Sequence, residues 1–90
     1  MLVALIALDK PGSQDLRLKV RADHVAYLKS SDSVHMAGPF LNAEGDMIGS
    51  LIVLDVVSMQ DAESWAAQDP YAQAGLFESV SLKEWKKVIG

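Results

Sequence analysis

The sequence has 90 residues, a formal net charge of −4 and no cysteine. Its length suits one domain, so we expect residues 1–90 to form a single unit. The lack of cysteine excludes disulfides and cysteine-based metal sites. The acidic balance makes nucleic acids and anionic membranes poor partners. The longest apolar run, residues 2–8, is too short to span a bilayer and lacks the flanks of a signal peptide, so we expect a cytoplasmic protein.

The first third of the chain predicts a strand and a helix. Residues 2–8 are apolar at every position, which is typical of a central strand buried on both faces. Residues 14–29 carry Leu18, Val25 and Leu28 near helical spacing, with charged side chains between them. This pattern predicts an amphipathic helix whose apolar face contains these three residues.

The middle of the chain predicts a strand hairpin. Residues 34–41 have the composition of a strand, and Pro39 places it at a sheet edge because proline cannot donate a ladder hydrogen bond. Residues 42–46 form a loop with a glycine suited to a left-handed turn position. Residues 48–57 are apolar on both faces and predict a second central strand.

The last third predicts a helix followed by a strand. The helix begins with Ser58 as its N-cap residue. It ends at Asp69, because a residue that precedes proline is driven out of the α region. Residues 76–88 alternate as a final strand, which places Phe77 and Leu82 on opposite faces.

The order of these elements predicts a ferredoxin-like βαββαβ sandwich of the α+β class, with a four-stranded antiparallel sheet. Right-handed crossovers place both helices on the same sheet face. The inner strands are apolar on both faces, and a bare face would be larger than the apolar patches of soluble monomers. We therefore expect a homodimer that associates through the sheet face as a dimeric α+β barrel. The alternative is a face partly covered by the chain's own C-terminal tail.

Two residues are candidates for acid–base chemistry. Asp69 stands at a helix C-terminus, where the helix dipole disfavours a negative charge. His24 lies on the first helix, one turn after Arg21, and histidine exchanges protons near neutral pH. Because both helices cover one face of the sheet, the two side chains are able to meet. The alternatives are a solvated turn carboxylate and a surface histidine.

Other residues are candidates for ligand contacts. Ser50 interrupts an aliphatic strand and would line a cleft, while Gly38 and Pro39 would allow the backbone to approach a ligand. Tyr71 would present its hydroxyl to a pocket or cap the core with its ring. His35 has no second ligand at metal spacing, so we expect no metal site. Phosphate-binding, dinucleotide-binding and nucleophile-elbow motifs are absent.

Taken together, these segments resemble the YciI-like (YCII-related) family. The likeness rests on five runs: GSLIVL at 49–54, AAQDPY at 66–71, AGLF at 74–77, RADH at 21–24 and AGP at 37–39. The link from the first helix to the edge strand lacks the glycine typical of the family, which affects loop geometry more than the candidate site. The resemblance implies a ferredoxin-like fold, a dimeric α+β barrel and a His–Asp pair, here His24 and Asp69.

The resemblance also implies a class of chemistry. One branch of the family is similar to a dehydrochlorinase of chlorinated hydroxyquinols, and the wider superfamily includes muconolactone isomerase. Both imply cofactor-free proton transfer, by elimination or isomerisation, on a small aromatic or lactone substrate. His24 would act as general base or acid and Asp69 would orient it. The candidate substrate-binding residues are Arg21, Ser50, Gly38, Pro39 and Tyr71.

Two other functions remain open at this point. The same cleft would serve a non-catalytic module that binds a small metabolite. A haem-using or oxygen-using barrel enzyme would need His24 or His35 as an iron ligand, and nothing in their spacing favours that role. We therefore expect no cofactor.

Overall fold

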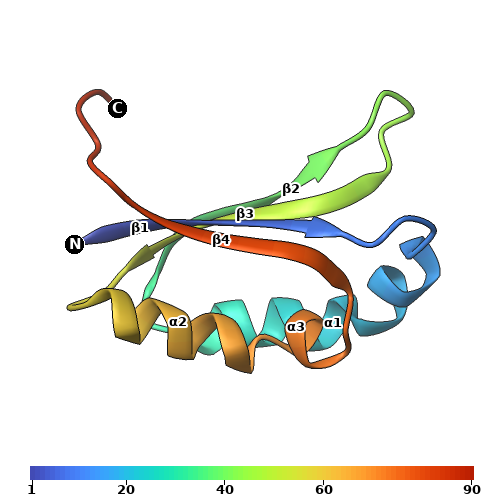
Figure 1. The fold of residues 1–90 in the computed structure, drawn as a ribbon, viewed down its shortest axis with the longest axis horizontal. Helices are drawn as coiled ribbons and strands as arrows, with labels where there is room; N and C mark the ends of the chain where they lie inside the picture. Colours follow the sequence, from blue (N-terminus) through green and yellow to red (C-terminus); the bar gives the residue numbers. More distant parts are fainter.

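Four antiparallel strands form one sheet, and three helices cover one of its faces in the computed structural model, which describes residues 1–90 (Figure 1). The elements follow in the order β1 (Leu2–Asp9), α1 (Gln14–Ser30), β2 (Val34–Leu41), β3 (Met47–Asp55), α2 (Met59–Gln68), α3 (Pro70–Gln73) and β4 (Phe77–Trp85). The strand order is β2-β3-β1-β4. This topology confirms the ferredoxin-like βαββαβ prediction, with β2 at one edge as Pro39 indicated. No helix is long and apolar enough to cross a membrane.

The two inner strands, β1 and β3, provide most of the core. In β1, Val3, Leu5 and Ala7 are buried, while the residues between them are only half-buried. Leu5 lies directly opposite Ile52 of β3, and both point toward the helices. Successive side chains of a strand point to opposite faces, so this apolar run supplies one set to the core and another to the opposite face.

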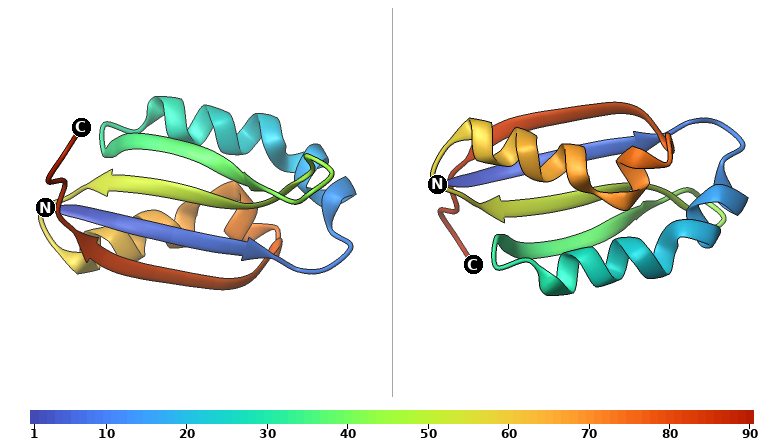
Figure 2. Two further views of the ribbon diagram at one scale, coloured as in Figure 1. Left: turned by 90° about the horizontal axis from the view of Figure 1, so that it is seen from above. Right: turned by 90° about the horizontal axis from the view of Figure 1, so that it is seen from below.

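The face turned away from the helices is uncovered (Figures 1 and 2). We call it the open face; strand pairing places on it Leu2, Ala4, Ile6, Leu8, Met36, Phe40, Leu51, Val53 and Trp85. The C-terminal tail leaves the sheet on this side but does not pack down, since Val88 and Ile89 are 82% and 91% exposed. Self-coverage by the tail is therefore not observed.

Gly49 of β3 lies on the open face where no side chain would fit. A Cβ there would lie 2.5 Å from the Ala7 carbonyl oxygen and 3.1 Å from the Phe40 ring. Both distances are shorter than ordinary van der Waals contact. The space above this glycine is filled by its neighbours on β1 and β2.

Helix α1 forms as predicted, but its inward face differs from the prediction. The buried residues of α1 are Arg17 and His24, whereas Leu18 is 63% exposed. The prediction that Leu18 belongs to the buried apolar face is therefore wrong. Residues 17, 21, 24 and 28 follow the i, i+4, i+7 and i+11 spacing of one helix face. Polar partners in the sheet and in the α2–α3 segment determine this rotation, as described below.

Helix α2 starts as its sequence indicates and is fastened to α1. The Ser58 hydroxyl accepts a hydrogen bond from the Asp61 amide, which confirms the predicted N-cap. Trp65 is buried, and its indole N–H donates to Ser31 Oγ at 2.8 Å. The Tyr27 hydroxyl donates to the Trp65 carbonyl oxygen, also at 2.8 Å. These contacts hold α1 and α2 side by side on the sheet.

The C-terminal third contains two features that the sequence did not indicate. The backbone of Asp69 is extended, which confirms that α2 ends there, but the chain starts the short helix α3 immediately after it. Leu8 pairs with Ser79 of β4, but the next residue, Asp9, pairs with Phe77, so the register shifts by one residue at this point. Phe77 and Leu82 therefore both pack against the core. The prediction that these two residues face opposite sides is wrong, because a β-bulge changes the alternation.

Candidate active site

His24 and Asp69 meet beneath the sheet. His24 Nδ1 lies 2.7 Å from Asp69 Oδ1, and the two residues are 6% and 1% exposed. His24 projects from the middle of α1, and Asp69 is the residue between α2 and α3. The contact spans 45 positions of sequence and joins the two groups that the sequence analysis singled out.

The position of Asp69 has a structural reason. Its Oδ1 also accepts a hydrogen bond from the Tyr71 backbone amide at 3.0 Å, as the N-cap of α3. A carboxylate that ends one helix is thus held by the first turn of the next. The end of α2 alone would disfavour this charge, but the start of α3 accommodates it.

The pairing determines where the imidazole carries its proton. An ionised carboxylate only accepts hydrogen bonds, so the His24 Nδ1–H donates to Asp69 and the neutral ring keeps its lone pair on Nε2. Nε2 has no partner in the chain, and His24 lines a cavity. Asp69 Oδ2 is buried without a hydrogen bond. The pair therefore presents an available base to the cavity.

Tyr71 holds the plane of the imidazole. Its ring stacks on His24 with centroids 3.9 Å apart and an angle of 18° between the planes. The Phe77 ring meets the Tyr71 ring edge-on, with 5.9 Å between the two centroids. The Arg17 guanidinium lies 4.6 Å from the centroid of the Tyr71 ring. Packing on several sides limits rotation of Tyr71 and thereby of His24.

A second buried ion pair lies beside the first, and sequence reasoning missed it. Arg17 Nε and Nη2 donate to the two carboxylate oxygens of Asp9 at 2.6 and 2.9 Å, and Nη2 also donates to Ser50 Oγ at 3.0 Å. Burial by itself would lower the pKa of Arg17. The hydrogen bonds and the charge of Asp9 have the larger combined effect, so the pKa of Arg17 is raised. The spacing of Arg17, seven residues before His24, is the signal that would have placed both on one helix face.

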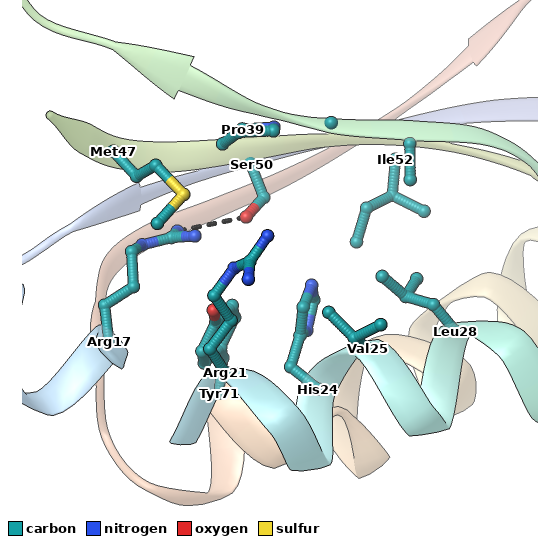
Figure 3. Close-up of a pocket in the computed structure, with 12 residues that line it drawn as sticks. Arg17, Arg21, His24, Val25, Leu28, Pro39, Met47, Ser50, Ile52 and Tyr71 are labelled. Atoms are coloured by element: carbon teal, nitrogen blue, oxygen red, sulfur yellow. Dashed lines mark hydrogen bonds between the residues drawn. The ribbon is translucent and has the colours of Figure 1, made fainter. Parts of the chain in front are cut away.

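The cavity lies between α1 and the β2–β3 half of the sheet (Figure 3). It has a volume of about 180 Å3 and is lined by Arg17, Arg21, His24, Val25, Leu28, Ala37, Gly38, Pro39, Met47, Ser50, Ile52 and Tyr71. The predicted ligand contacts Arg21, Ser50, Gly38, Pro39 and Tyr71 thus share one cavity with His24. Asp69 stands behind the imidazole, and His35 lies outside on the edge strand. No three His, Asp or Glu side chains converge as a metal-ligand set.

Both tyrosines of the chain are expected to ionise above their ordinary pKa of about 10. Burial raises the Tyr71 pKa, the charges of Arg17 and Arg21 oppose this, and those of Asp69 and Asp9 add to it. Burial and the charge of Asp69 raise the pKa of Tyr27. Because the tyrosine pKa is higher in the folded protein than the value of about 10 in the unfolded chain, the protonated tyrosines stabilise the fold. This stabilisation is complete below about pH 10, and it is lost as the pH rises through the pKa values of the folded protein.

The absorbance of tyrosinate during an alkaline titration measures the pKa values of the two tyrosines directly. The native protein should titrate later than the urea-unfolded chain, and its loss of structure should accompany ionisation. A native tyrosine that titrates with the unfolded chain would contradict the burial described here.

The sequence model of the YCII-related domain matches residues 1–86. The chain belongs to the YCII-related family. Protein YciI of Escherichia coli is 35% identical to this YCII-related chain over 98 aligned positions, which cover 99% of the chain and all of the relative. The match confirms the family resemblance drawn from the five sequence runs.

Solved structures add to the comparison. A 5-chloro-2-hydroxyhydroquinone dehydrochlorinase from Burkholderia phenoliruptrix, in complex with 2,5-dihydroxybenzoquinone, superposes with a TM-score of 0.90 at 33% identity. The match covers 96% of the YCII-related chain and 94% of the dehydrochlorinase. An antibiotic biosynthesis monooxygenase has a TM-score of 0.58 at 14% identity, covering 97% and 100% of the two chains, and shares the fold. The likeness to the dehydrochlorinase supports a small-molecule role, either as an enzyme or as a binding protein.

Proposed function

We propose that this YCII-related protein is an enzyme that moves a proton on a small organic substrate, by elimination or isomerisation, without a metal or an organic cofactor. The observation that carries the proposal is the buried His24–Asp69 pair, whose free Nε2 belongs to a cavity wall. A base that is oriented by a carboxylate and placed beside a substrate-sized space is suited to general acid–base catalysis.

The proposed reaction starts when His24 Nε2 takes a proton from a substrate carbon or hydroxyl. The electron pair left behind forms a new double bond. In an elimination the leaving group departs with its bonding pair, and the imidazolium later returns its proton to water. In an isomerisation the imidazolium protonates a different atom of the same substrate. Asp69 stabilises the imidazolium in both cases, because the Nδ1–H already donates to its carboxylate.

The remaining cavity residues have proposed binding roles. Arg21 and Ser50 would contact polar groups of the substrate, and Tyr71 would keep the imidazole plane fixed. Gly38 and Pro39, on edge strand β2, would bound the cavity next to the substrate. Support for a small aromatic substrate comes from the dehydrochlorinase of similar structure, which is in complex with a dihydroxybenzoquinone.

Turnover assays test the proposal. Candidate substrates are 5-chloro-2-hydroxyhydroquinone, with release of chloride, and small unsaturated lactones, with deuterium uptake from heavy water. We expect chloride release or deuterium exchange that depends on His24. Binding of these compounds with neither event would instead support the metabolite-binding alternative.

Replacing Asp69 with asparagine tests the second member of the pair. The Tyr71 amide should keep an acceptor oxygen at the Oδ1 position, so the imidazole retains its proton on Nδ1 while the negative charge is lost. A hydrogen bond to a charged group contributes about 1.5–3 kcal/mol, so kcat/KM should fall by about 10- to 100-fold. Nitrogen NMR of the imidazole should show the same tautomer in both proteins. A tautomer change, or unaltered kinetics, would refute this role for Asp69.

We also propose that two copies associate through the open face. Leu8, Met36 and Trp85 are 45%, 45% and 42% exposed there, although such residues are usually covered. A second copy with the same apolar face would cover them, and a two-fold axis makes the interface self-complementary.

Leu51→Lys should disrupt this dimer. Leu51 lies opposite Ile6 on the two inner strands, so two-fold association would bury both introduced lysines near the centre of the interface. Burying unpaired charges costs several kcal/mol, and sedimentation should then give the monomer mass of 9.7 kDa. Leu18→Lys, on the exposed side of α1, is the matched control and should leave the mass at twice that value. Identical masses for wild type and both variants would rule out this interface.

A further inference from the structure

Arg21 is a cation of the cavity that has no partner. Of the three basic side chains that α1 directs toward it, Arg17 is paired with Asp9 and His24 with Asp69. Arg21 makes no ion pair or side-chain hydrogen bond, although the chain has 12 acidic residues against eight Lys and Arg. The cavity therefore holds one uncompensated positive charge when His24 is neutral.

Arg21 is exposed to solvent, so water screens its charge and leaves only a weak repulsion from the neighbouring cation Arg17. Arg17 and Arg21 are four residues apart on one helix, and like charges at this spacing repel each other. Asp9 compensates only the first of them. Arg21 lines the cavity, and its guanidinium lies beside the His24 ring in Figure 3. A ligand anion would supply the charge that the chain omits.

The cavity is polar at one end and apolar at the other (Figure 3). The polar end contains Arg17, Arg21 and Ser50, with the Met47 side chain beside Arg17. The apolar end is formed by Val25, Leu28 and Ile52. The His24 ring lies between the two ends. A ligand that fits both ends has a charged group attached to an apolar body, and the imidazole then faces the atoms where the two join.

The volume limits the size of that body. A cavity of about 150 Å3 accommodates benzene. The present cavity, at about 180 Å3, therefore suits one substituted ring.

We propose that the site selects single-ring compounds with one oxyanion, a carboxylate or a phenolate, which binds at Arg21 with the ring against the apolar end. This inference rests on the proposed function, from which it takes the location of the site. It adds the charge of the preferred ligand and the orientation of that ligand in the cavity. The proton that His24 moves then belongs to an atom near the point where the anionic group joins the ring. The guanidinium offers paired N–H donors that match such an oxyanion.

Binding of matched probes tests the proposal without turnover. Benzoate, benzamide and benzamidine share a ring and differ in charge, and 4-nitrophenolate tests the phenolate form of the anion. Calorimetry should show benzoate or 4-nitrophenolate binding at least tenfold more tightly than benzamide, with benzamidine weakest. Arg21→Gln should weaken anion binding by about 10- to 100-fold, as expected for a lost charged hydrogen bond. Lys19→Gln removes the same charge from an exposed position of α1 and should leave affinity unchanged.

A stability measurement separates binding from a structural role. Without ligand, Arg21→Gln should melt at or above the wild-type temperature, because it relieves the repulsion with Arg17. Benzamide binding as tightly as both anions, or full anion affinity in Arg21→Gln, would overturn the proposal. Neither result would affect proton transfer by His24, and a catalytically inactive protein that selects anions would preserve this inference while refuting the proposed function.

Discussion

His24→Gln is expected to lower kcat/KM by about 10²- to 10⁴-fold, which is the contribution of a well-placed general base. Glutamine has a similar size and its amide is able to donate to Asp69, so the buried carboxylate keeps a partner. Its side chain has no lone pair basic enough to take a proton at neutral pH. The loss should therefore appear in kcat, because the substrate contacts proposed for Arg21 and Ser50 are retained.

His35→Gln is the control for this experiment. The chain has two histidines, and His35 is exposed on edge strand β2 outside the cavity. Its replacement should leave kcat and KM at wild-type values, and circular dichroism should show that both variants are folded. Equal activity in the two variants would eliminate His24 as the base.

Asp9→Ala is expected to cost about 3–5 kcal/mol of unfolding free energy, because it leaves the buried Arg17 guanidinium without its carboxylate. Arg17 is 3% exposed, and its remaining hydrogen bond goes to the neutral Ser50 hydroxyl. Domains of this size have about 5–15 kcal/mol of stability in total, so the variant should be close to unfolding at room temperature. Urea denaturation of the wild type and the variant measures the difference.

The double variant Asp9→Ala/Arg17→Met separates the unpaired charge from lost packing. Methionine fills much of the arginine volume without a charge, and buried ion pairs replaced by apolar residues often lose little stability. Most of the loss should therefore be recovered. A cost below 1 kcal/mol for Asp9→Ala, as for exposed ion pairs, would show that this pair is solvated in solution.

The fold could be predicted because its determinants are local. Apolar runs marked the two inner strands, Pro39 marked the edge strand, and Ser58 marked the start of α2. Gly45 has φ of 84°, the left-handed conformation that the hairpin required. Each of these signals depends on a few adjacent residues, so no tertiary information was needed.

The site could be predicted only in part. His24 and Asp69 were identified, and the family resemblance joined them. Asp9 resembled an ordinary charged residue at the end of a strand, and its pairing with Arg17 arises only when β1 and α1 are packed together. The rotation of α1 follows from that pair, which explains why Leu18, a typical core residue, was assigned to the wrong side.

The contact between the Tyr71 amide and Asp69 has a consequence for divergence within such a scaffold. Every amino acid except proline provides that amide, so the hydrogen bond that holds the Asp69 carboxylate does not depend on the side chain at position 71. Mutations of cavity residues other than Tyr71, whose ring holds the imidazole plane, would thus change which compound is accepted while the His24–Asp69 pair keeps its geometry. If the proposed function holds, new substrate preferences would be able to arise here by few substitutions, with the His24–Asp69 pair inherited intact.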